Sequence, residues 1–177
     1  MIYCALANLV RGCYIVAMTF PKAVLAFSLC FGAACAQTPA AVTVDNGNGT
    51  TVSVTLSDLA KLPQQTVKVT DHGTAVTFDG VLLSDVLAQV KMPSGEQLRG
   101  KALAAYLLVE AADGYRAVFA LPELDAGFTD RKIYLVFKRN GAALSDKEGP
   151  FRIVVPDEKR AARWVRQVVA LRIRQAS

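Results

Sequence analysis

The sequence has few residues that could bind a metal ion or act as a thiol nucleophile. It contains four cysteines and one histidine, His72, in 177 residues. The cysteines all precede residue 36, at Cys4, Cys13, Cys30 and Cys35. Residues 37–177 therefore offer no disulfide, thiolate ligand or thiol nucleophile, and one histidine cannot form a multi-histidine site. We predict no metal site there.

Signatures of common catalytic sites are also missing from residues 37–177. There is no G-x-S-x-G, H-E-x-x-H, C-x-x-C or phosphate-loop pattern. His72 lies in the turn of a predicted hairpin, which favours a turn role over a ligand role. Asp113 precedes Gly114 and could point into a pocket, but an Asp-Gly turn explains it without a function. The catalytic residues, if there are any, stay unknown.

Acidic residues are absent from residues 1–36. Lys22 precedes the apolar run 23–34, which is too short to span a bilayer, and Ala-Cys-Ala follows at 34–36. A basic flank, an apolar core and an A-x-A site are typical of a cleaved secretory signal peptide. We expect a periplasmic protein that begins near Gln37 and has no membrane span after cleavage.

Two alternatives remain for this leader. Met18 opens a more ordinary signal peptide than Met1 does, so translation can be placed at either residue. Lipidation at Cys35 is the second alternative, although Gly32 stands where an aliphatic residue is usual. The sequence leaves both open.

The rest of the chain predicts one domain. Residues 37–50 are small and polar, which indicates a flexible N-terminal segment, and residues 51–177 are long enough for a single core. Residues 37–130 carry 6 Lys and Arg against 11 Asp and Glu, whereas residues 131–177 carry 12 against 4. The basic C-terminal third could be a solvated face or could bind an anionic small molecule, an acidic membrane surface or nucleic acid. Without Arg-Gly repeats interleaved with aromatic residues, nucleic acid is the least favoured partner.

Hydrophobic alternation and turn residues predict many short strands and few helices. The expected strands are 51–55, 66–70, 75–78, 105–112, 115–119, 133–137, 151–155 and 168–174. The expected helical pieces are a short helix capped by Thr55 or Ser57, 82–90 with Ser84 as cap, 96–103 and 121–124. This order indicates an α+β fold rather than alternating βαβ units.

Three local expectations follow from turn residues and alternation. Residues 79–80, Asp-Gly, should turn the chain, and residues 113–114 should form a two-residue hairpin turn facing a Glu110–Arg116 pair. Residues 133–137 have no polar side chain and should form an interior strand. In residues 168–174, Val169, Leu171 and Ile173 should face the core, opposite Arg172 and Arg174.

The stretch 148–164, EGPFRIVVPDEKRAARW, joins an apolar strand to the densest cluster of positive charge. Gly149 and Pro150 should turn the chain, and Pro156 should stop the strand. Lys159, Arg160 and Arg163 follow within five residues, with Trp164 as an anchor. A segment of this kind can hold an anion at a fixed place on a sheet.

Three phrases together carry a resemblance: FDGVLLSDVL (78–87), AADGYRAVFALPEL (111–124) and GPFRIVVPDEKRAARWVRQVVALRI (149–173). In this order they resemble the molybdopterin-binding domain of the sulfite oxidase family, in particular its small stand-alone exported members. The resemblance implies a mixed β-sheet fold of the α+β class with a few short helices. It also implies molybdopterin as cofactor, with its phosphate held by Arg152, Lys159, Arg160 and Arg163. The alternative is a basic surface turn with Trp164 packed underneath.

Two features depart from the family pattern. Full-length members bind molybdenum through a cysteine in an N-terminal portion that this chain lacks, and they follow V-V-P with G-x-x-G-A-R-x-V-K-W, whereas this chain has DEKRAAR between Pro156 and Trp164. The sequence therefore predicts an exported oxidoreductase-like protein with a pocket for an anion but no cysteine ligand, which argues for a non-catalytic member. The alternative is a cofactor-free binding or scaffold module that docks a periplasmic protein through its basic C-terminal face.

Overall fold

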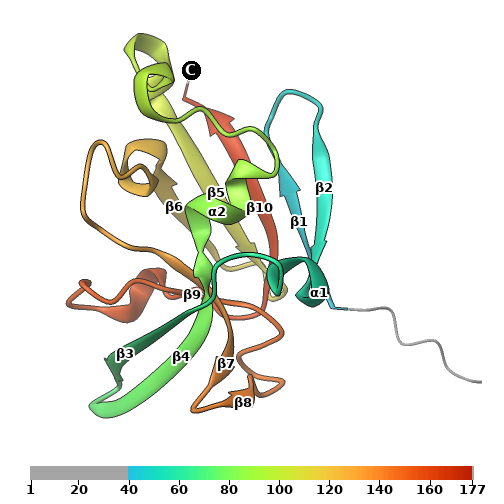
Figure 1. Ribbon diagram of the computed structural model, residues 1–177, viewed down its shortest axis with the longest axis vertical. Helices are drawn as coiled ribbons and strands as arrows, with labels where there is room; N and C mark the ends of the chain where they lie inside the picture. Colours follow the sequence, from blue (N-terminus) through green and yellow to red (C-terminus); the bar gives the residue numbers. More distant parts are fainter. Residues whose placement is uncertain (1–39, 177) are drawn as a thin grey trace, which may run out of the picture. The chain divides into compact units, whose positions relative to one another are not determined.

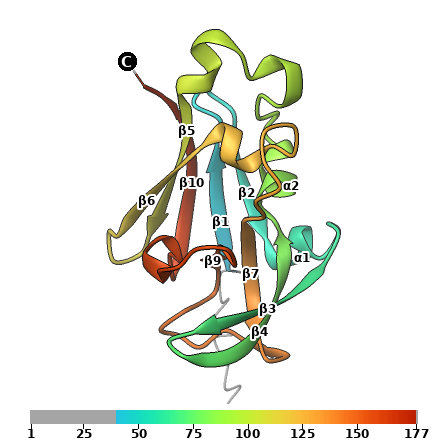
Figure 2. The same cartoon turned by 90° about the vertical axis from the view of Figure 1, so that its left-hand side faces the viewer.

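The computed structural model describes residues 40–176, which form two β-sheets around one hydrophobic core (Figures 1 and 2). The first sheet has the strand order β2-β1-β10-β5-β6, and the second has the order β3-β4-β7-β8, with β9 also paired to β7. The first sheet consists of β1 (Ala41–Asp45), β2 (Thr51–Thr55), β5 (Ala105–Ala111), β6 (Arg116–Ala120) and β10 (Val168–Gln175). The second consists of β3 (Gln65–Asp71), β4 (Thr74–Leu82), β7 (Tyr134–Arg139), β8 (Ala142–Ala143) and β9 (Arg152–Val154).

Helical structure is confined to short pieces. They are α1 (Leu56–Leu59), α2 (Leu83–Ala88) and the 3-10 turns η1 (Gly95–Gln97), η2 (Gly100–Ala104), η3 (Leu121–Leu124) and η4 (Ala161–Arg163). Thr55 caps α1 in a capping box with Asp58, which decides between the two predicted caps. The expected Ser84 cap is wrong, because α2 begins at Leu83 with Leu82, the last residue of β4, at the N-cap position and no side-chain cap. No helix among residues 40–176 has the length and apolar character needed to cross a membrane.

The N-terminal segment contains a strand, which corrects the expectation of flexibility over residues 37–50. β1 pairs antiparallel with β2 and parallel with β10, so it is an interior strand of the first sheet. Val42 and Val44 on its inner face have no exposed surface. Alternating valines in a sequence of small residues are enough for a strand when partners exist on both sides.

The outer face of β10 differs from the expectation at one residue. Leu171 and Ile173 are buried as predicted, but the side chain of Val169 is 41% exposed. The register between β10 and β5 shifts between Val168 and Ala170. A one-residue irregularity of this kind reverses which side chains face the core, so Val168 is buried in place of Val169.

The β3–β4 hairpin turns at His72 and Gly73, whose φ angles are 50° and 81°. These left-handed angles match the two-residue turn that joins tightly twisted strands, so the prediction for His72 as a turn residue is confirmed. The turn expected at Asp79 and Gly80 is wrong. Both residues lie inside β4, where its register with β7 shifts between them.

The remaining connections are close to the predictions. The chain reverses between β5 and β6 over residues 112–115, a longer loop than the predicted two residues. The side-chain Oδ1 of Asp113 accepts a hydrogen bond from the backbone N–H of Tyr115 at 2.9 Å, so Asp113 stabilises this turn. Glu110 pairs with Arg116 at 3.2 Å, as expected. β7, expected as an interior strand, has β4 on one side and β8 and β9 on the other.

Candidate functional site

The candidate site surrounds η4, the single turn that follows β9. β9 is buried along its length, and the chain leaves it at Pro156. Trp164, directly after η4, is only 5% exposed, and its indole N–H donates to the carbonyl oxygen of Val155 at 3.0 Å. This contact holds the basic turn against the end of β9, so Trp164 acts as the predicted anchor.

Arg152, one of the four predicted anion-binding residues, is buried beneath this turn. Its side chain is 1% exposed. The Nη1 atom donates to Asp71 Oδ2 at 3.0 Å and to Glu148 Oε1 at 2.6 Å. The guanidinium also lies 5.1 Å from the Phe78 ring centroid and 5.6 Å from that of Trp164. The structure therefore pairs Arg152 with internal carboxylates and aromatic rings.

A second arginine completes this buried cluster. Arg139 Nη1 lies 2.8 Å from Glu148 Oε1 and 3.6 Å from Asp71 Oδ2. Two guanidinium groups and two carboxylates thus balance one another in charge. Arg152 Nε and Asp71 Oδ1 are buried atoms without a hydrogen-bond partner among the described residues. Such atoms are places where an ordered water or a ligand atom is stabilised.

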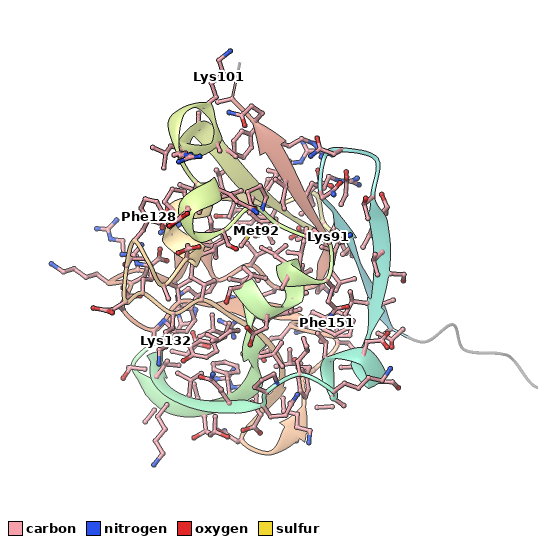
Figure 3. The ribbon with its side chains drawn as sticks, turned by 45° about the horizontal axis from the view of Figure 1, so that its top comes forward. Lys91, Met92, Lys101, Phe128, Lys132 and Phe151 are labelled. Atoms are coloured by element: carbon pink, nitrogen blue, oxygen red, sulfur yellow. The ribbon has the colours of Figure 1, made fainter. Side chains whose placement is uncertain are left out.

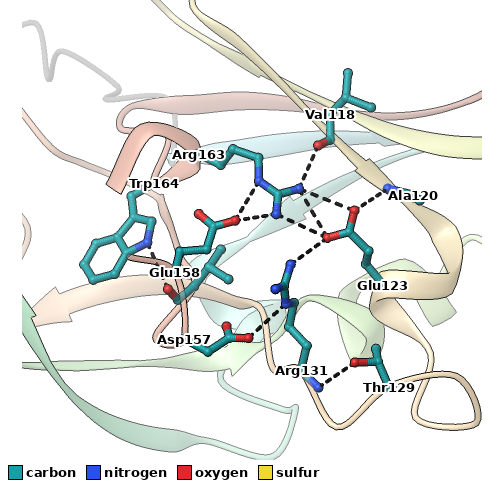
Figure 4. A network of polar contacts seen from close by, with 10 residues as sticks. Val118, Ala120, Glu123, Thr129, Arg131, Asp157, Glu158, Arg163 and Trp164 are labelled. Atoms are coloured by element: carbon teal, nitrogen blue, oxygen red, sulfur yellow. Dashed lines mark hydrogen bonds and ion pairs between the residues drawn. The ribbon is translucent and has the colours of Figure 1, made fainter. Parts of the chain in front are cut away.

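Arg163, the second predicted residue that is paired internally, belongs to another network (Figure 4). Its Nε donates to Glu158 at 2.7 Å, and its Nη1 donates to the carbonyl oxygen of Val118 at 3.1 Å. Its Nη2 lies 3.2 Å from Glu123 Oε2, and the guanidinium lies 4.5 Å from the Phe119 ring centroid. Arg163 therefore ties η4 to β6 and η3.

Glu123 is the centre of that network. It also accepts hydrogen bonds from Arg131 at 3.0 Å and from the backbone N–H of Ala120 at 3.2 Å. Burial alone would raise the pKa of Glu123, but the hydrogen bonds from Arg163 and Ala120 lower the pKa below its ordinary value. Glu123 therefore stays ionised as an internal counter-ion, and Asp157 balances Arg131 from the other side at 2.9 Å.

Lys159 and Arg160, the other two predicted residues, are exposed and form no ion pair among the described residues. They line a recess of about 580 Å³ with the turn residues His72 and Gly73. Ala161 and Trp164 form part of its wall. This recess brings together two free cations that an anion could contact directly.

A second recess lies on the other side of the same turn. Lys147 and Arg166 line it, together with Asp113 and Tyr115, and its volume is about 340 Å³. Ala161 and Trp164 border both recesses, so η4 separates them. The hydroxyl of Tyr115 donates to the carbonyl oxygen of Ala162 at 2.8 Å and fixes this wall. Lys147 and Arg166 are not among the residues predicted from the sequence, although Arg166 lies in one of the three segments that carry the resemblance.

The cations of the basic C-terminal third fall into two groups, those that pair with carboxylates and those that do not. Six of its arginines pair with carboxylates: Arg131, Arg139, Arg152, Arg163, Arg172 and Arg174. The other six cations have no ion pair among the described residues: Lys132, Lys138, Lys147, Lys159, Arg160 and Arg166. Four of these line the recesses beside η4. Most of the free cations of the C-terminal third therefore lie beside η4.

The described residues fit the phosphate of a pterin better than they fit its metal. Within residues 40–176 there is no cluster of three or more His, Cys, Asp or Glu side chains that could hold a metal ion. All four cysteines of the sequence lie outside this part of the chain. The free Lys and Arg side chains provide the donors that a phosphate requires, whereas molybdenum lacks a thiolate ligand here.

The arrangement of strands is shared with a solved structure. The backbone is similar to one in the crystal structure of the sulfane dehydrogenase SoxCD from Paracoccus pantotrophus, with a TM-score of 0.58 and 21% sequence identity over 75% of this chain. This chain spans 37% of the length of that chain. One mixed sheet, one antiparallel sheet and a few short helices therefore define an α+β domain of the sulfite oxidase molybdopterin-binding type.

The family is shown by the sequence itself. The model of the oxidoreductase molybdopterin-binding domain family matches residues 37–177, and the chain belongs to that family. This confirms the resemblance drawn from the three phrases. No curated protein matches the sequence.

Proposed function

We propose that this protein is an exported member of the family that binds the phosphate of a molybdopterin, or a similar small oxyanion, on the surface around η4. The observation that carries the proposal is the group of four unpaired cations beside this turn: Lys147, Lys159, Arg160 and Arg166. A phosphate is bound most strongly by an Arg fork together with the point charge of Lys. Lys159 and Arg160 present one of each in a single recess.

Arg152 and Arg163 would support this site from behind. Each is held by two carboxylates and lies against aromatic rings, so neither guanidinium is free to turn outward. Their role is then to fix β9 and η4, and thereby the backbone that carries Lys159 and Arg160. A bound molybdopterin would supply redox chemistry through its metal, and the residues of this chain would bind and orient its phosphate.

The second candidate function is a cofactor-free module that docks a periplasmic partner through the basic C-terminal face. The observation in its favour is the absence of cysteine from residues 40–176. A chain cleaved after residue 36 would retain no thiolate for molybdenum. This supports a non-catalytic member under either candidate.

Cofactor content and anion binding test the proposal together. The full chain is expressed in a molybdenum-replete host that exports it, and the purified protein is analysed for molybdenum by mass spectrometry and for oxidised pterin by fluorescence. Thermal unfolding is then followed with increasing pyrophosphate. A ligand that binds only the folded state raises the melting temperature, so we expect stabilisation of the wild type.

Double substitutions in each recess test where the anion binds. Lys159→Ala with Arg160→Ala should abolish the stabilisation, and Lys147→Ala with Arg166→Ala shows whether the second recess contributes. The matched control is Lys68→Ala with Lys138→Ala, which removes the same charge from exposed residues of β3 and β7. An equal loss in all three pairs would mean non-specific attraction. Absence of both pterin and stabilisation in the wild type would reject the proposal in favour of the docking module.

A further inference from the structure

Another concave surface of the domain is separate from the two anion recesses. It has a volume of about 880 Å³, within the range of small-molecule sites. Its walls come from β3, η3, the loop 128–132, the start of β7 and the residues after β9. Pro156 borders both this cleft and the recess of Lys159 and Arg160. We name it the Phe128 cleft.

The lining of the Phe128 cleft is mainly apolar. Its apolar residues are Val67, Pro122, Phe128, Tyr134 and Pro156. Phe128 is 49% exposed, and Figure 3 shows it on the same flank of the domain as Lys132, whereas Phe151 lies inside. An exposed aromatic ring beside other apolar side chains is typical of a surface that receives a ligand.

Arg131, which also lines the cleft, is already paired within the domain. Arg131 donates to Asp157 Oδ2 at 2.9 Å and to Glu123 Oε2 at 3.0 Å. Its backbone N–H also donates to the hydroxyl of Thr129 at 3.1 Å. This network holds the loop 128–132 in place. The guanidinium of Arg131 therefore requires no carboxylate from a ligand.

The two residues that flank Arg131 differ from it because they are unpaired in the part of the chain that the structure describes. Asp130 and Lys132 both line the cleft and both are exposed. Neither forms an ion pair with any residue of the described chain, and they do not pair with each other. The apolar cleft therefore has one free carboxylate and one free ammonium group on the same loop.

We propose that the Phe128 cleft binds a zwitterion with an apolar side group, of the chemical class of the free hydrophobic α-amino acids. The ligand ammonium would contact Asp130, its carboxylate would contact Lys132, and its side group would pack against Phe128 and the two prolines. A simple anion is repelled by Asp130 and a simple cation by Lys132, whereas a zwitterion is attracted by both. This inference is independent of the proposed anion site around η4.

The test is isothermal titration of the purified full chain with L-phenylalanine and three analogues. Phenethylamine keeps only the positive charge, 3-phenylpropanoate keeps only the negative charge, and N-acetyl-L-phenylalaninamide keeps neither. We expect L-phenylalanine to bind about tenfold more tightly than either singly charged analogue, because each removes one charge-assisted hydrogen bond. No binding of L-phenylalanine at millimolar concentration would overturn the inference.

Single substitutions test which residue contacts each charged group of the ligand. Lys132→Met should remove the preference for L-phenylalanine over phenethylamine, and Asp130→Asn should remove the preference over 3-phenylpropanoate. Phe128→Ala should weaken all ligands by about tenfold, which corresponds to the loss of a large aromatic contact. All three residues are exposed, so folding is not at risk.

The matched controls are Lys138→Met and Asp146→Asn, which change exposed charges outside the cleft. They should leave every affinity unchanged. If the two charge variants in the cleft bind the four compounds with the same preferences as the wild type, the zwitterion site is wrong. Binding that depends on Phe128 but on neither charge would equally overturn it, since it would indicate an apolar surface alone.

Discussion

At the scale of single residues, the cations of the basic C-terminal third separate by chemical type. The six that are paired inside the domain are all arginines, whereas four of the six free cations are lysines. A guanidinium makes several hydrogen bonds in fixed directions and is more weakly hydrated than an ammonium group, so it is the better partner for a buried carboxylate. Arg152, held between Phe78 and Trp164, is the clearest example.

Removing Arg152 should expose how strongly this cluster is coupled to folding. In Arg152→Met the side-chain volume is nearly kept, but buried Asp71 and Glu148 lose a shared partner. Breaking a buried pair in this way typically costs about 3–5 kcal/mol of unfolding free energy. Urea denaturation followed through the fluorescence of the single tryptophan, Trp164, measures it.

The matched control for this variant is Lys159→Met, because Lys159 is exposed and unpaired. It should change the unfolding free energy by no more than about 0.5 kcal/mol. An Arg152→Met protein within about 1 kcal/mol of the wild type would contradict the coupling, since such a change is typical of an ordinary surface substitution.

At the scale of elements, the longest strand of the molecule contains the residues that looked most like a turn. Asp-Gly is a strong turn signal, yet Asp79 and Gly80 continue β4 across a register shift opposite β7. A Cβ atom at residue 80 would lie 2.4 Å from the carbonyl oxygen of Leu135 and 2.7 Å from the Cα of Val136. Glycine is needed here because the neighbouring backbone approaches too closely for a side chain.

Gly80→Ala should therefore destabilise the domain. The clash is with backbone atoms of β7, which cannot rotate away, so we expect a loss at or above the upper end of the roughly 1–3 kcal/mol that overpacking usually causes. Thermal and urea unfolding measure it. Gly127→Ala is the control, because there the nearest atom is a side-chain oxygen of Asp125 in a loop. Equal effects of the two changes would show that the contact between β4 and β7 does not require glycine.

The sequence predicted most elements but not how distant ones combine. Hairpins and alternating strands were predictable because their signals are local, as at residues 72–73. β1 was missed because residues 37–50 were interpreted as a flexible segment from their small and polar composition, although β1 pairs with the neighbouring β2 as well as with the distant β10. The exposed pair Lys159 and Arg160 could be predicted from the charge cluster. The burial of Arg152 could not, because its partner Asp71 is 81 residues away.

At the scale of the whole molecule, the uneven distribution of charge along the sequence corresponds to ion pairs between the two regions of the folded domain. The acidic first two-thirds supplies Asp45, Asp71, Glu110 and Glu123, and these pair with arginines of the basic last third. Much of the charge asymmetry is therefore used to hold the two regions of the chain together. The charges left unpaired, among them the free cations beside η4, then contribute most to the field at the surface.

These internal ion pairs predict that the folded domain loses stability in acid. The pKa of Glu110 is lowered from its ordinary value of 4.5, mainly by the hydrogen bond from Arg172. The pKa of Asp45 is lowered mainly by the backbone N–H of Gly47 and then by Arg174. A carboxylate whose folded pKa is depressed binds protons more readily in the unfolded chain, so its contribution is complete above the ordinary pKa and disappears as pH falls through the folded value.

We therefore expect the melting temperature to be steady near neutral pH and to fall progressively below about pH 4.5, the ordinary glutamate range. Calorimetry between neutral and strongly acidic pH measures this. Glu110→Gln should make the decline shallower, because one titrating group with a lowered pKa is removed. A melting temperature that is constant or rises over the same acid range would contradict the expectation.

The parallel pairing of β1 with β10 has a consequence for biosynthesis. Thr43 and Ala170 are neighbours in the sheet, but they lie far apart in the chain, so β1 is synthesised well before β10. Nearly all other residues of the domain are synthesised between them. An interior strand of the first sheet must therefore remain unpaired on one edge until β10 has been synthesised, because non-local strand pairing can only follow the synthesis of both partners. The first sheet is therefore expected to be completed late, once β10 has emerged, rather than progressively as the earlier strands emerge.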